Sequence, residues 1–125
     1  MDDLYQAFLL DHYKHPRNWG KQENADLIIK ESNASCGDAF TFYISLELDA
    51  DGIQVIKEVK FEGEGCVIST AASSILTEDL KGKFIQELKN LDLAYMQSII
   101  GIEVSAARHK CLLLATRAIK NALYQ

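Results

Sequence analysis

The chain has 125 residues, 48% of them apolar, and a formal net charge of -5. A chain of this length and composition can bury a core without disulfides or a second domain, so we expect one domain over residues 1–125. The acidic balance and the dispersed basic residues exclude a nucleic-acid surface. No apolar run reaches the roughly 18 residues of a membrane-spanning helix, and no basic amphipathic segment predicts membrane binding.

The amino terminus reads Met1-Asp2-Asp3, without the positive charge that precedes the apolar run of a signal peptide. The three cysteines, Cys36, Cys66 and Cys111, are odd in number and widely spaced, which argues against a disulfide framework. We therefore expect a cytoplasmic protein whose cysteines are free thiols.

The first predicted element is a short amphipathic helix, in which Leu4, Phe8 and Leu9 recur at helical spacing and which ends before Pro16. Residues 27–30, 40–48 and 53–61 are rich in β-branched and aromatic types and predict strands. In the second strand, the apolar residues alternate with the other side chains at a period of two: Phe40, Phe42, Ile44, Leu46 and Leu48. The turn residues at 49–52 predict a hairpin between the last two strands.

After residues 63–65 the periodicity becomes helical, with Ile68, Ala72 and Ile75 on one stripe and Gly82 as a stop. Further helices are predicted at 84–89, at 91–100 and from about 106 to 123. Strands followed by helices predict an α+β fold, in which a three-stranded antiparallel sheet carries helices packed on one face.

Cys66 follows two glycines and opens a helical pattern. Its thiol is therefore expected near a helix amino terminus, where the macrodipole favours the thiolate, a metal ligand and nucleophile. A lone cysteine more often fills a small apolar gap, and for Cys66 alone that interpretation stays open.

Cys111 is expected early in the last helix. The basic neighbours Arg108 and Lys110 are expected to lower its pKa, and His109 offers an imidazole. Cys111 also shares a helical stripe with Leu114, so packing in the core is an equal alternative.

The sequence Cys36-Gly37-Asp38 is the strongest local signal, because Gly37 permits a turn sharp enough for the thiol and the carboxylate to converge. A plain turn in which Asp38 accepts backbone hydrogen bonds is the alternative. Taken with the other two cysteines, this motif predicts a metal site of soft thiolates and one hard carboxylate, suited to zinc, iron or a labile cluster. His12 and His15 are expected to lie outside this site.

Three motifs together resemble those of the U-type iron-sulfur cluster scaffold proteins, namely IscU, SufU and the amino-terminal domain of NifU. They are Cys36-Gly37-Asp38, the stretch from Phe61 through Cys66 to Ser74, and Lys110-Cys111 before Leu114-Ala115. The opening His12 to Gly20 is similar to the start of these proteins, and the resemblance spans nearly the whole chain.

The resemblance implies that Cys36, Asp38, Cys66 and Cys111 surround one exposed site. It implies that a cysteine desulfurase delivers persulfide sulfur to one of these thiolates, that iron enters, and that a labile 2Fe-2S cluster is built and passed to apo acceptor proteins. Zinc held by the same residues is the alternative occupant.

Two departures leave the subfamily open. The IscU type carries a histidine immediately before the last cysteine, whereas Lys110 stands here and His109 is displaced by about 100° around a helix. Residues 102–107 also lack the Leu-Pro-Pro-Val-Lys stretch that an Hsp70 chaperone reads, which argues against chaperone-assisted transfer. The stretch from Phe61 to Cys66 favours the SufU type, and so does Lys110. The insertion that the SufU type carries ahead of its last helix is missing, however. The sequence thus indicates a SufU-like or intermediate member.

Three hypotheses follow. The leading one is a non-catalytic assembly scaffold. The second is a zinc-dependent sulfurtransferase that carries persulfide without building a cluster. The third is an interaction module with a structural zinc, in which metal binding is coupled to folding.

Overall fold

A computed structural model describes residues 3–124, so Met1 and Asp2, on which the signal-peptide argument partly rests, lie outside it. Helix α1 spans Asp3–Lys14, as expected from its periodicity, and ends just before Pro16. Strands β1 (Leu27–Asn33), β2 (Asp38–Leu48) and β3 (Gln54–Glu64) form one antiparallel sheet in the order β1-β2-β3. The predicted sheet is confirmed.

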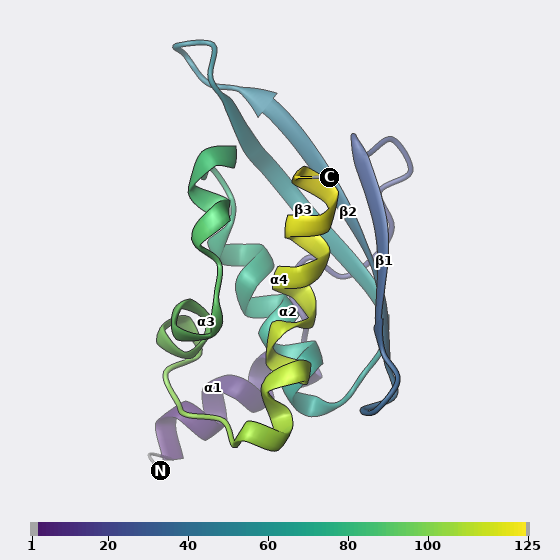
Figure 1. Cartoon of the computed structure of the whole chain (residues 1–125), viewed down its shortest axis with the longest axis vertical. Helices are drawn as coiled ribbons and strands as arrows, with labels where there is room; N and C mark the ends of the chain where they lie inside the picture. Colours follow the sequence, from purple (N-terminus) through teal and green to yellow (C-terminus); the bar gives the residue numbers. More distant parts are fainter. Residues whose placement is uncertain (1–2, 125) are drawn as a thin grey trace.

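The helical elements after the sheet are α2 (Val67–Asp79), η1 (Ile85–Asn90), α3 (Leu93–Ile100), η2 (Ala106–Arg108) and α4 (His109–Leu123). Figure 1 shows α2, α3 and α4 on one side of the sheet, as predicted, while α1 crosses near the opposite end from the β2–β3 turn. Several bounds differ from prediction. Residues 85–90 and 106–108 are 3-10 turns, α3 begins at Leu93 rather than at 91, and α4 begins only at His109. The strands are longer than predicted, since β1 continues to Asn33, β2 begins at Asp38 and β3 continues to Glu64.

The register of the sheet decides where the candidate ligands meet. Asn33 pairs with Asp38 across the β1–β2 turn, and Ala39 pairs with Glu64 near the end of β3. The start of β2 and the end of β3 therefore lie side by side at one end of the sheet. Cys36, Asp38 and Cys66 are connected to that end, although up to 30 positions separate them in the sequence.

The core lies between the sheet and helices α2 and α4. Phe42, Ile44 and Phe61 from the sheet are fully buried against Leu76 and Leu112. The predicted apolar alternation in β2 holds through Ile44 and then fails, because a bulge between Ser45 and Leu46 shifts the register. Leu48 is 66% exposed, and in Figure 1 the β2–β3 hairpin extends beyond the helices that cover the rest of the sheet.

Two other segments hydrogen-bond to the outer side of β3. The Phe61 amide donates to the Asn18 carbonyl, and its carbonyl accepts from the Gly20 amide, both at 2.9 Å. Farther along, the Ile56 amide donates to the Lys83 carbonyl at 2.9 Å, and the Gly82 amide donates to the Ile56 carbonyl at 2.8 Å. The segment after α1 and the segment after α2 are thereby fixed to the sheet.

Across residues 3–124, every helix is too short or too polar to pass through a lipid bilayer.

Candidate metal centre

Cys36 occupies the turn between β1 and β2. Its amide donates to the Asn33 carbonyl at 3.2 Å, and Gly37 adopts φ +71°, a left-handed conformation that strains residues with a side chain. The chain therefore reverses between Cys36 and Asp38, as predicted. The Cys36 side chain is half-buried, whereas Asp38, the first residue of β2, is only 2% exposed.

Cys66 is the N-cap residue of α2, so the helix starts where the sequence predicted. Its Sγ accepts a hydrogen bond from the Ser69 amide at 3.4 Å, which satisfies one of the free amides of the first turn. Its own amide donates to the Asp38 Oδ1 at 3.0 Å. Cys66 is thus tied to Asp38 through its backbone.

Cys111 lies in the first turn of α4, where it faces Cys36. The Cys111 Sγ lies 2.7 Å from the Cys36 Sγ, and the side chain is 1% exposed. Both sequence interpretations of Cys111 therefore apply, because it is packed in the interior and also faces another thiol.

The ligand atoms of Cys36, Asp38 and Cys111 all lie within 4.8 Å of one another, which is close enough to surround one ion. Cys66 is outside this group of three. Its thiol is directed back toward the first turn of α2 by the capping hydrogen bond, although it remains close enough to Cys111 to influence the titration of that thiol.

The expectation that basic neighbours lower the pKa of Cys111 is wrong. Burial, with smaller contributions from Cys36, Cys66 and Asp38, raises the pKa of this thiol well above its ordinary value. Arg108 and Lys110 are exposed, so water screens their charge.

The donor chemistry fits a metal. Asp38 Oδ2 is buried and has no hydrogen-bond partner among residues 3–124, which is costly for a carboxylate oxygen unless a cation or a donor reaches it. A carboxylate oxygen beside soft thiolates is a donor set that zinc and iron accept.

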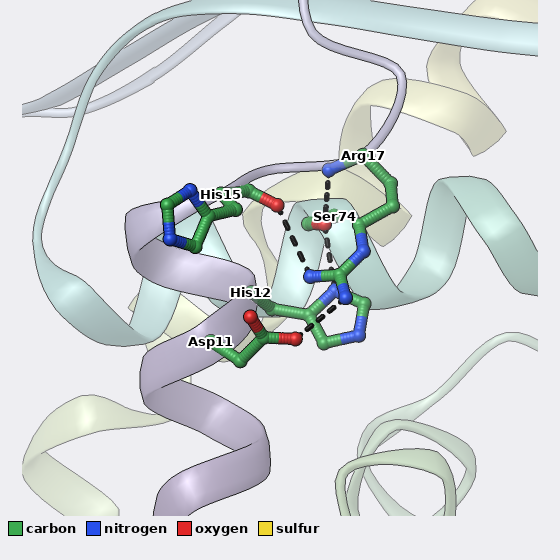
Figure 2. Close-up of polar contacts among 5 residues, drawn as sticks. All are labelled: Asp11, His12, His15, Arg17 and Ser74. Atoms are coloured by element: carbon green, nitrogen blue, oxygen red, sulfur yellow. Dashed lines mark hydrogen bonds and ion pairs between the residues drawn. The ribbon is translucent and has the colours of Figure 1, made fainter.

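His12 and His15 lie away from these ligands, as expected. His12 of α1 is buried against α2, and its Nδ1 lies 2.7 Å from the Ser74 Oγ. The same Oγ accepts a hydrogen bond from the Arg17 amide at 2.8 Å. Figure 2 shows this cluster, in which Arg17 pairs with Asp11 and the His15 ring turns away from Ser74. The Nε2 of His109 is 3.0 Å from the Val104 carbonyl.

Sequence reasoning missed Ser69. This residue stands three positions after the N-cap and is fully buried, and its hydroxyl donates to the Asp38 Oδ1 at 2.8 Å. The third position of a helix is the one from which a polar side chain, usually Glu or Gln, can reach back to the cap residue. The Ser69 hydroxyl lies 3.3 Å from the Cys66 carbonyl, so its spacing from Cys66 was the available signal.

Residues 4–125 match the model of the NifU-like N-terminal domain. The chain belongs to this family. It is 31% identical to the zinc-dependent sulfurtransferase SufU of Bacillus subtilis (strain 168), over 98% of this chain and 91% of that protein. It is 33% identical to the iron-sulfur cluster assembly scaffold protein IscU of Thermotoga maritima, over 96% and 92% respectively.

The fold is also found in a solved member. A crystal structure described as an iron-sulfur cluster assembly scaffold protein for the SUF system, from Fervidobacterium islandicum AW-1, superposes with a TM-score of 0.74 at 33% identity, covering 93% of each chain. The resemblance inferred from the three cysteine motifs is therefore confirmed. The alignment with the Bacillus SufU extends over 140 positions, so that relative carries residues that this 125-residue chain lacks.

Proposed function

We propose that this chain is a scaffold on which iron-sulfur clusters are assembled. A cysteine desulfurase supplies persulfide sulfur, a reductant supplies the electrons that convert it to sulfide, and iron enters. A labile 2Fe-2S cluster then forms on Cys36, Asp38, Cys66 and Cys111 before transfer to apo acceptor proteins. The supporting observation is the meeting of two sulfur atoms and a buried carboxylate within 4.8 Å in a NifU-like domain. The cluster is cargo rather than a resident cofactor.

The unequal exposure of the thiols supports sulfur delivery from outside. Cys36 and Cys66 are half-buried, and Cys66 lines an open hollow between α1 and residues 102–108, whereas Cys111 is buried. In the proposed transfer, a scaffold thiolate attacks the outer sulfur of the desulfurase persulfide, and the desulfurase thiolate leaves. Free thiols persist in a reducing compartment, so the proposal places the reaction in the cytoplasm.

Anaerobic reconstitution tests the proposal. The protein is incubated with a cysteine desulfurase, cysteine, ferrous iron and a thiol reductant as electron donor, and the visible spectrum and the iron and sulfide contents are measured. Absorption typical of a 2Fe-2S centre, followed by activation of an apo-ferredoxin, is expected. The variants Cys36→Ser, Cys66→Ser and Cys111→Ser should each lose stable metal binding. Metal content in Cys111→Ser equal to that of the parent would remove this thiol from the ligand set.

A second candidate is a zinc-dependent sulfurtransferase that accepts persulfide from the desulfurase and passes it on without a cluster. The name of the Bacillus relative favours it, and so does a donor set of thiolates and one carboxylate, which suits zinc. In the same reconstitution, this alternative predicts retained zinc, a protein-bound persulfide detected by mass spectrometry, and no visible cluster absorption.

A further inference from the structure

Ser69 has two candidate ligands as neighbours. Its hydroxyl donates to the Asp38 Oδ1 at 2.8 Å, and its amide donates to the Cys66 Sγ at 3.4 Å. The Cys66 Sγ also lies 3.5 Å from the Ser69 Oγ. One buried residue of α2 is therefore in contact with a carboxylate from β2 and with the thiol that caps its own helix.

The two oxygens of Asp38 are unequal because of these contacts. Oδ1 accepts from the Cys66 amide at 3.0 Å and from the Ser69 hydroxyl. Oδ2 is buried and lacks a hydrogen-bond partner within the described part of the chain. Two donors on one oxygen fix the plane and the rotation of the carboxylate, and they leave the other oxygen as its only open donor atom.

The Ser69 side chain has little freedom to leave this position. A Cβ atom built on Gly65 would meet the Ser69 Oγ and would lie 2.6 Å from the Phe40 Cζ, so the backbone of Gly65 closes over both. Phe40 is 2% exposed and packs edge-on against Phe61. The hydroxyl is therefore held against Asp38 by the packing of Gly65 and Phe40.

We propose that Ser69 is a positioning residue of the metal centre, which orients Asp38 so that Oδ2 alone is offered to the metal. This inference rests on the proposed assignment of Asp38 as a ligand. Without the Ser69 hydroxyl, Asp38 keeps a single donor on Oδ1, and its carboxylate can rotate and present either oxygen or both. The number and direction of its metal bonds then change.

The test uses Co²⁺ and Zn²⁺ with the metal-free, reduced full-length chain. Cobalt absorption reports the geometry and number of its ligands, and competition with a chelator gives the zinc affinity. Ser69→Ala should lower zinc affinity by about 10–100-fold, the range found when an outer partner of a metal ligand is removed. The cobalt spectrum should change as well, while Ser69→Thr, which keeps the hydroxyl, should restore both.

Ser73→Ala is the matched control. Ser73 lies one turn farther along α2, is also fully buried, and its Oγ has no partner among residues 3–124. This variant should bind both metals as the parent does. In an Asp38→Asn background, Ser69→Ala should have little additional effect on affinity, because the group that it orients is no longer a carboxylate.

Unchanged affinity and an unchanged cobalt spectrum in Ser69→Ala would overturn the inference, as would an equal loss in Ser73→Ala, which indicates a packing effect. If Ser69→Ala is unfolded without metal, Ser69→Thr and Ser69→Val replace it, since they match in volume and differ by the hydroxyl. Failure of the parent protein to bind either metal or a cluster would instead refute the proposed function. If the parent protein binds metal normally and Ser69→Ala binds it equally well, only the inference about Ser69 is refuted.

Discussion

Gly65→Ala is expected to destabilise the metal-free protein through two separate contacts. The added methyl carbon would lie 2.6 Å from the Phe40 Cζ, whereas carbon atoms in contact are about 3.5–4.0 Å apart. Relieving that overlap by shifting a packed aromatic ring costs about 1–3 kcal/mol. The methyl also meets the Ser69 Oγ, and displacing it removes the hydrogen bond to Asp38, which is worth about 1.5–3 kcal/mol for a charged acceptor.

The two contributions give a predicted loss of about 2.5–6 kcal/mol in the free energy of unfolding. For a domain of this size, that corresponds to a fall of about 8–20 °C in Tm. Urea denaturation followed by circular dichroism, with chelator and reductant present, measures the free energy directly. A thermal scan under the same conditions gives the second value.

Gly82→Ala provides the control. Gly82 has φ +81°, and a Cβ built on it meets nothing within 4 Å, so its substitution costs only the left-handed backbone strain of about 1–2 kcal/mol. Gly65→Ala must therefore be clearly the more destabilising of the two. A loss equal to or smaller than that of Gly82→Ala would show that the packing around Ser69 and Phe40 yields easily, and the reasoning would be refuted.

Three further predictions concern the ligand, the buried histidine and the metal. Asp38→Ala should slow cluster transfer to an apo-ferredoxin by roughly tenfold, about 1.4 kcal/mol in the barrier, because the hard and weakly held ligand is lost; an unchanged transfer rate removes that role. Burial, and after it the positive charge of Arg17, lowers the pKa of the His12 imidazole below its ordinary value of 6.5. The neutral imidazole therefore contributes its full stability above about pH 6.5, and this contribution is lost as the pH falls through the lower pKa of the folded state. Urea titrations at about pH 7.5 and about pH 5.5 should show this acid destabilisation, and His12→Gln should reduce it. Chelation should leave the far-ultraviolet circular dichroism unchanged, because the apolar side chains around Phe42 and Leu112 form a core that needs no metal to hold it together; unfolding on chelation would favour the structural-zinc hypothesis.

The sequence predicted the parts of this fold that depend on local pattern. The period-two alternation from Phe40 to Ile44 gave the strand, and the glycines before a helical stripe placed Cys66 at a helix start, where the structure has it as the N-cap. Leu48 was assigned to the apolar face by the same pattern. Its exposure depends on a bulge and on how far the helices cover the hairpin, and neither is encoded within the strand itself.

The candidate site required long-range information that spacing does not carry. The sequence supplied the residue types, but only the antiparallel register brings the start of β2 beside the end of β3, and only the position of α4 brings Cys111 to Cys36. For the same reason, the pKa of Cys111 was predicted with the wrong sign, since adjacent positive charges are visible in a sequence and burial is not.

The attachment of residues 18–20 and 82–83 to β3 has a consequence for self-association. An outer strand with unpaired amides and carbonyls can recruit a strand from another molecule and begin aggregation. At Phe61 and at Ile56, those outward groups already have partners within the chain. Addition of a foreign strand along β3 would first have to detach both segments, so edge-to-edge polymerisation through this side of the sheet is blocked while the protein is folded.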